Sequence, residues 1–65
     1  MKVKDFINLL DFPQDVTLII YSYKLWDDVF EGKAVDLPKL SYLQEENVNG
    51  FELPAKNTLI LNIRL

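Results

Sequence analysis

The side chains that most often perform catalysis are scarce in this chain of 65 residues. It contains no His, the commonest general base near neutral pH, and no Cys, an intrinsically strong nucleophile. Its two serines, Ser22 and Ser41, lack the flanking glycines that form the sharp turn of a nucleophile elbow. We therefore predict that the protein is not an enzyme.

The patterns that bind cofactors and metals are also missing. Gly32 and Gly50 are the only glycines, so no glycine-rich loop is available to hold a phosphate. Without His and Cys the usual zinc ligand sets cannot form. Asp27, Asp28 and Glu31 offer oxygens to a hard cation, but they lack the alternating spacing and the Gly of an EF-hand loop. We expect no cofactor and no metal.

The charged residues favour neither a nucleic acid nor a membrane as partner. The net charge is −3, and the seven Lys and Arg residues are scattered, so no basic cluster can neutralise a run of phosphates. No apolar run approaches the roughly 18 residues that span a membrane, and no secretory leader is recognisable. The sequence predicts a cytoplasmic protein that binds neither nucleic acid nor membranes.

A run of large apolar residues occurs where a polar loop is expected. Tyr23, Leu25 and Trp26 follow a predicted strand and precede the acidic pair Asp27 and Asp28. Aromatic residues are enriched in the centres of protein interfaces, so Tyr23, Leu25 and Trp26 are candidate partner-binding residues. A second interpretation is that the loop folds back and Trp26 covers one end of a small core. The sequence leaves both interpretations open.

The sequence predicts two helices. Apolar residues at helical spacing from Val3 to Leu10 predict a helix over residues 3–11, which Pro13 ends. A second, short helix begins at the capping residue Asp36. Its core-facing residues are predicted to be Leu37, Leu40 and either Leu43 or Tyr42.

Four strands are predicted from their β-branched and aromatic residues. Residues 16–23 have apolar side chains at both alternating sets of positions, which is typical of a central strand covered on both faces. They are predicted to pair with residues 29–35 in a hairpin. Gly32 indicates either a bulge or a close approach of another group to the backbone in that second strand. Residues 48–53 and 58–65 form two more strands. The final strand is equally compatible with an edge, open to pairing with another chain, and with the centre of the sheet.

The resulting order, αββαββ, indicates a single α+β domain over residues 1–65. We expect an antiparallel four-stranded sheet with the helices mainly on one face. A domain of this size buries only about 60% of the surface that its unfolded chain exposes. Because no disulfide or zinc site is available to compensate, we expect a homodimer.

Several segments carry a resemblance that spans nearly the whole chain. They are the opening Met-Lys-Val-Lys-Asp-Phe-Ile-Asn-Leu-Leu, the Phe30-Glu31-Gly32 step, the Asp36-Leu37-Pro38 helix start, and the closing Asn57-Thr58-Leu59-Ile60-Leu61-Asn62-Ile63. Together they resemble short uncharacterised proteins encoded by phages and prophages of Gram-positive bacteria. The matching residues are core positions, a cap and turns, so the resemblance assigns no functional residue. The chain departs from the pattern at Lys2, where a Ser or Thr would cap the first helix.

The sequence therefore predicts a non-enzymatic accessory protein of phage or prophage type that acts by binding another protein. One alternative is an acidic inhibitor of a host nuclease of the restriction or CRISPR type. Another is a small structural component of a larger assembly, which would expose a large apolar patch. The inhibitor requires one contiguous acidic face made by Asp27, Asp28, Glu31, Glu45, Glu46 and Glu52.

Overall fold

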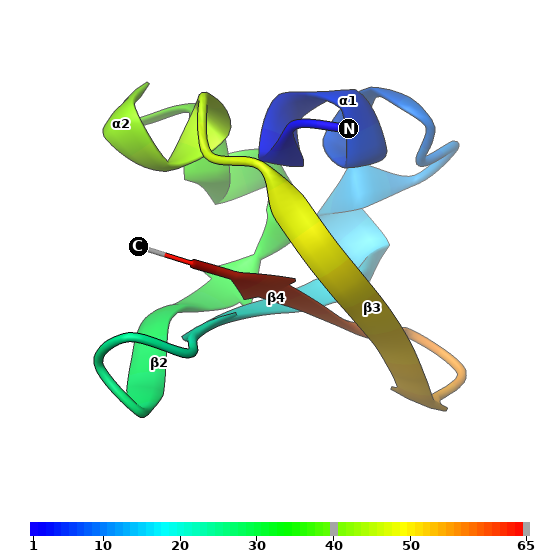
Figure 1. Cartoon of the computed structure of the whole chain (residues 1–65). Coiled ribbons are helices and arrows are strands. Elements are labelled where there is room, and N and C mark those ends of the chain that lie inside the picture. Colours follow the sequence, from blue (N-terminus) through cyan, green and yellow to red (C-terminus); the bar gives the residue numbers. More distant parts are fainter. Residues whose placement is uncertain (40, 65) are drawn as a thin grey trace.

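The computed structural model describes residues 1–39 and 41–64 (Figure 1). The α+β class and the four strands are as predicted. Leu40 and Leu65, which belong to the predicted second helix and last strand, lie outside the described residues. The elements, in chain order, are α1 (Val3–Asn8), the 3-10 helix η1 (Pro13–Asp15), β1 (Thr17–Ser22), β2 (Asp27–Lys33), the 3-10 helix η2 (Ala34–Lys39), α2 (Ser41–Gln44), β3 (Val48–Ala55) and β4 (Thr58–Ile63).

The sheet is mixed, so the prediction of an antiparallel sheet is wrong. Its strand order is β2-β1-β4-β3. Short turns make β1–β2 and β3–β4 antiparallel hairpins, but β1 and β4 pair in parallel. The segment η2–α2 between the hairpins is long enough for the crossover that a parallel pair requires. The carboxy-terminal strand is consequently central and offers no free edge.

Burial explains why β1 and β4 occupy the centre. Alternate residues of both strands are buried, whereas β2 and β3 are largely exposed along their lengths. Pro54 in β3 is compatible with an edge, because proline cannot donate to a strand ladder. The most apolar strands are thus inside the sheet and the more polar strands are at its edges.

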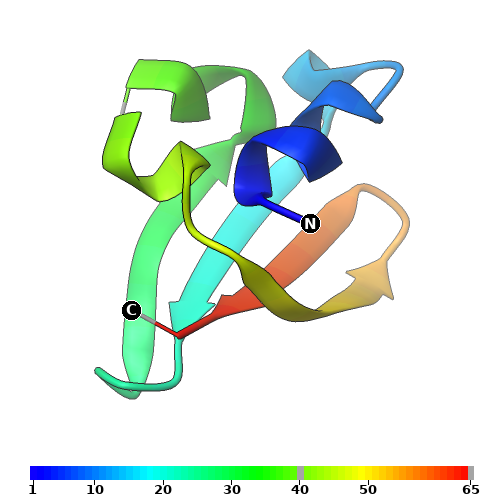
Figure 2. The same cartoon turned by 45° about the horizontal axis from the view of Figure 1, so that its top comes forward.

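The hydrophobic core lies between the sheet and the helical segments. In Figures 1 and 2 the helices lie together on one side of the strands. On that side the described part of the chain buries Ser22 and nine hydrophobic residues: Val3, Leu18, Ile20, Ala34, Leu37, Leu43, Leu59, Leu61 and Ile63. Tyr42, the alternative to Leu43, is exposed.

The other face of β1 is not covered as its apolar pattern predicted. Ile19 and Tyr21 are only half-buried there. The described helices contribute to the core on the opposite side of the sheet, where Leu18 and Ile20 are fully buried. The central strand β1 therefore has apolar side chains on both faces of the sheet, and those on one face remain accessible.

The first helix is shorter than predicted, and the second differs from the prediction in type. The backbone N–H of Lys2 donates to Oδ2 of Asp5 at 3.0 Å, so the start of α1 is fixed by the acidic residue in its first turn. The N–H groups of Leu9 and Leu10 bond to carbonyls three residues earlier, which tightens the helix and ends it before residue 11. The second predicted helix is divided into η2 and α2.

The bulge in β2 is not at Gly32. Gly32 pairs in regular register with Leu18, whereas the register shifts opposite Ile20 and Tyr21, leaving Val29 as the extra residue. A Cβ at Gly32 would lie 3.4 Å from Cζ of Phe30. The Phe30 ring therefore lies at van der Waals distance from this position, and a small side chain at residue 32 would touch the ring without displacing it.

Candidate functional site

The strand register builds an accessible surface on the side of the sheet away from the helices. One transverse row runs from Glu31 on β2 through Ile19 and Ile60 to Glu52 on β3. We call this surface the open face and define it by that row and the adjacent one. The open face consists of Ile19, Tyr21, Asp28, Glu31, Glu52, Ile60 and Asn62.

The open face continues to the end of the β1–β2 hairpin through two aromatic rings. Tyr21 and Tyr23 pack edge to face, with ring centroids 5.8 Å apart and an interplanar angle of 84°. Tyr23 joins Asp28 and Glu52 in lining a shallow depression over the centre of this face. Aromatic rings and carboxylates therefore line the same surface.

The predicted partner-binding residues are all exposed at this hairpin end. The exposed fractions are 46% for Tyr23, 55% for Leu25 and 79% for Trp26. Trp26 does not cover the core, so that interpretation is wrong. The role of these three residues in partner binding stays a prediction.

The hairpin end is held in a tight turn by Ser22. The N–H of Trp26 donates to the carbonyl oxygen of Ser22 at 2.9 Å, and the N–H of Leu25 donates to its Oγ at 3.2 Å. Ser22 itself is fully buried. Its hydroxyl therefore fixes the loop that presents Leu25 and Trp26.

An apolar groove that the sequence analysis missed lies between α1 and the β3–β4 hairpin. Phe6 and Phe51 contact each other across it, with ring centroids 5.6 Å apart, and Leu9 and Leu53 line it with large exposed fractions. Its volume of about 250 Å³ is below the range usual for small-molecule sites. The available sequence signal was Leu9, an apolar residue outside the core-facing helical stripe.

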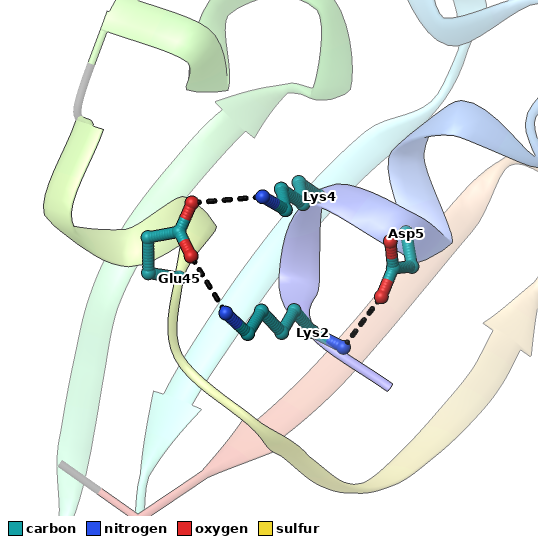
Figure 3. Close-up of polar contacts among 4 residues, drawn as sticks. All are labelled: Lys2, Lys4, Asp5 and Glu45. Carbon is teal, nitrogen blue, oxygen red and sulfur yellow. Dashed lines mark hydrogen bonds and ion pairs between the residues drawn. The ribbon is translucent and has the colours of Figure 1, made fainter.

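A polar cluster ties α1 to the segment after α2 (Figure 3). Glu45 accepts hydrogen bonds from Nζ of Lys2 at 2.8 Å and from Nζ of Lys4 at 2.9 Å. These bonds lower the pKa of Glu45 to about 2, and the carboxylate in turn raises the pKa of Lys2. A carboxylate held ionised in this way is a poor general base near neutral pH, so we assign the cluster a structural role.

Protonation of Glu45 is expected to weaken the attachment of α1 at low pH. Because its pKa falls from an ordinary 4.5 to about 2 in the folded protein, the ion pairs stabilise the fold fully above pH 4.5 and are lost as the pH falls toward 2. An NMR titration of the side-chain carboxyl measures this pKa.

Glu45→Gln provides the control for this titration. This variant should remove the change in the free energy of unfolding that occurs between pH 4.5 and about 2. High salt should also weaken the contribution of the ion pairs to stability, because the side chains of Lys2, Lys4 and Glu45 are partly exposed. A Glu45 that titrates at its ordinary value would contradict the ion pairs.

The acidic residues required for a nuclease inhibitor are divided between two sides of the molecule. Asp28, Glu31 and Glu52 belong to the open face. Glu45 and Glu46 lie beside α1 instead, where they form ion pairs and a backbone hydrogen bond. This distribution does not favour a surface that imitates a nucleic acid.

Within residues 1–39 and 41–64, no group of three or more acidic residues lies close enough together to hold a metal ion. The set considered from sequence, Asp27, Asp28 and Glu31, forms no such group. No helix in the same part of the chain is long and apolar enough to cross a membrane.

Comparisons with protein-family models, curated proteins and solved structures gave no significant match for this chain. The function must therefore be inferred from the surfaces of the fold, which are the hairpin end, the open face and the apolar groove beside α1.

Proposed function

We propose that this protein is a non-enzymatic binding protein that contacts a protein partner through Tyr23, Leu25 and Trp26. The observation that carries the proposal is Trp26. Its side chain is 79% exposed, and its backbone has a positive φ of 56°. A large apolar side chain therefore faces solvent from an unfavourable backbone conformation.

Two physical arguments support a role for Trp26 in binding. Tryptophan is enriched among the residues that dominate the energy of protein interfaces. The left-handed backbone region favours Gly or Asn over other residues, and strained conformations cluster at functional sites. A tryptophan at this position contributes little to the core, so partner binding gives it a physical role.

The other functional expectations have narrower support. The phage or prophage origin rests on the sequence resemblance alone, and the homodimer rests on the small size of the core. The structural component of a larger assembly stays a prediction, for which the exposed apolar groove beside α1 is the relevant surface.

Trp26→Ala is expected to lose a partner that the wild-type protein captures. The loss should be large, because truncating a central interface aromatic commonly costs about 2 kcal/mol or more, which weakens binding roughly 30-fold. Affinity capture from a lysate of cells that express the protein, with the captured proteins identified by mass spectrometry, measures this effect.

The matched control is Phe12→Ala. Phe12 is another exposed aromatic, at 63%, and it precedes β1 whereas Trp26 follows it. Circular dichroism should show both variants folded. Equal capture by the wild type and Trp26→Ala would contradict the proposal, as would a loss confined to Phe12→Ala.

A further inference from the structure

We propose that the open face binds an amphipathic helix of a partner protein, with Lys or Arg residues on both sides of the apolar stripe of that helix. The proposal rests on the proposed function only in requiring a protein partner. It concerns the sheet surface rather than the hairpin end.

The centre of the open face supplies the apolar contact. Ile19 and Ile60 lie side by side on the two central strands, and Tyr21 follows in the next row. All three are half-buried by their neighbours, while the described helices pack on the other side of the sheet. An apolar stripe on a partner would cover these three side chains.

The edges of the open face supply acidic groups on both sides of this apolar centre. Glu31 and Glu52 are the two ends of the same row, three strand spacings apart. At about 4.8 Å per spacing they are separated by roughly 14 Å. An α-helix with its side chains is about 10–12 Å across. A helix lying along β1 and β4 therefore fits between the two carboxylates.

The carboxylates of the open face are free to pair with a partner. Unlike Glu45, which binds Lys2 and Lys4, neither Glu31 nor Glu52 forms an ion pair with another residue of the described chain. The same holds for Asp28, one row from Glu31 on β2.

Charge selects the kind of partner. The register places three acidic side chains on this face of the sheet, those of Asp28, Glu31 and Glu52. It places one basic side chain there, that of Lys33, at the end of the face beside Thr17. Two copies of this surface would repel each other, and nucleic acid phosphates would be repelled as well. Lys or Arg residues along both sides of a helix complement the carboxylates at both edges.

A pair of synthetic helices tests this inference. Each has about 14 residues, roughly 21 Å in length, close to the length of the six-residue strand β1. Both carry the same leucine stripe, flanked by Lys in one peptide and by Glu in the other. Isothermal titration measures affinity, and two-dimensional NMR of the full chain identifies the residues whose amide signals shift.

The full chain is expected to bind the Lys-flanked helix and to discriminate against the Glu-flanked one, with shifts centred on Ile19, Tyr21 and Ile60. The double variant Glu31→Lys/Glu52→Lys should reverse this preference. It should bind the Lys-flanked helix at least tenfold more weakly and gain affinity for the Glu-flanked one.

The matched control is Asp11→Lys/Asp15→Lys, which makes the same change in net charge at exposed positions that are not among the residues of the open face. It should retain the preference for the Lys-flanked helix. Trp26→Ala should also retain the preference for the Lys-flanked helix, so a failure of the hairpin proposal and a failure of the open-face proposal are distinguishable.

The inference is overturned if the control variant Asp11→Lys/Asp15→Lys loses the preference as fully as Glu31→Lys/Glu52→Lys. It is also overturned if the wild type binds neither helix up to roughly 1 mM, or if the shifts map to the groove beside α1.

Discussion

Leu61→Ala is expected to remove most of the free energy of unfolding. Leu61 is fully buried at the centre of β4, where it pairs with Ile20 of β1 on one side and Phe51 of β3 on the other. Truncating a buried leucine costs about 2–5 kcal/mol. Domains of this length are typically stable by roughly 3–10 kcal/mol in total. Urea unfolding followed by circular dichroism measures the loss.

Ile60→Ala provides the matched control, because Ile60 is the neighbour of Leu61 on the same strand but lies on the open face. It is half-buried, so its truncation is expected to cost only about 1 kcal/mol. Equal losses from the two variants would mean that the open face is covered in solution and that Ile60 is buried there.

Trp26→Gly is expected to raise the free energy of unfolding, by about 0.5–1 kcal/mol. Relieving a left-handed conformation at a residue with a Cβ gains roughly 1–2 kcal/mol. The greater backbone entropy of glycine in the unfolded chain offsets part of that gain. Few contacts are lost, because the Trp26 side chain is so exposed. For a domain of this size the gain corresponds to a rise in melting temperature of several degrees, about 4–8 °C per kcal/mol.

Trp26→Ala separates backbone strain from side-chain loss. Alanine keeps the Cβ and hence the strain at φ 56°, so this variant should show no gain in stability. Both variants should lose the captured partner, which gives Trp26→Gly higher stability and weaker binding at once. If Trp26→Gly melts below the wild type, the side chain makes stabilising contacts and the backbone argument fails.

The parts of the fold that follow local patterns could be predicted from sequence. The last strand, predicted over residues 58–65, is present as β4, and the alternate apolar residues Leu59, Leu61 and Ile63 are buried on one side of it. The boundaries of the elements were less accurate because they depend on single hydrogen bonds. The end of α1 is an example, since no residue type marks the bonds made by the N–H groups of Leu9 and Leu10.

The pairing of β1 with β4 could not be predicted in the same way. Hairpins follow from the short turns between neighbouring strands, but the register of Leu18 beside Leu59 depends on how the two hairpins meet through the helical layer. Apolar residues on both parities of β1 also gave no indication that one face would stay uncovered. Periodicity reports the apolar sides of a strand and says nothing of which side the helices cover.

The candidate site was predicted in part. The sequence identified Tyr23, Leu25 and Trp26 as unusual for a loop, but the exposure of Trp26 depends on the turn that Ser22 holds. The open face depends on β2 and β3 occupying opposite edges, which brings Glu31 and Glu52 into one row. That arrangement exists only once the strand order is known.

The parallel pair at the centre of the sheet has a consequence for the folding kinetics. Each hairpin can form from neighbouring residues, whereas β1 and β4 meet across about 40 intervening residues, and such non-local pairing is slow. Until they meet, both strands present unpaired backbone edges, and they are the two strands with the most buried apolar residues. Unpaired apolar edges readily join those of other chains. The slowest step in folding is therefore also the step at which newly made copies are most prone to aggregate.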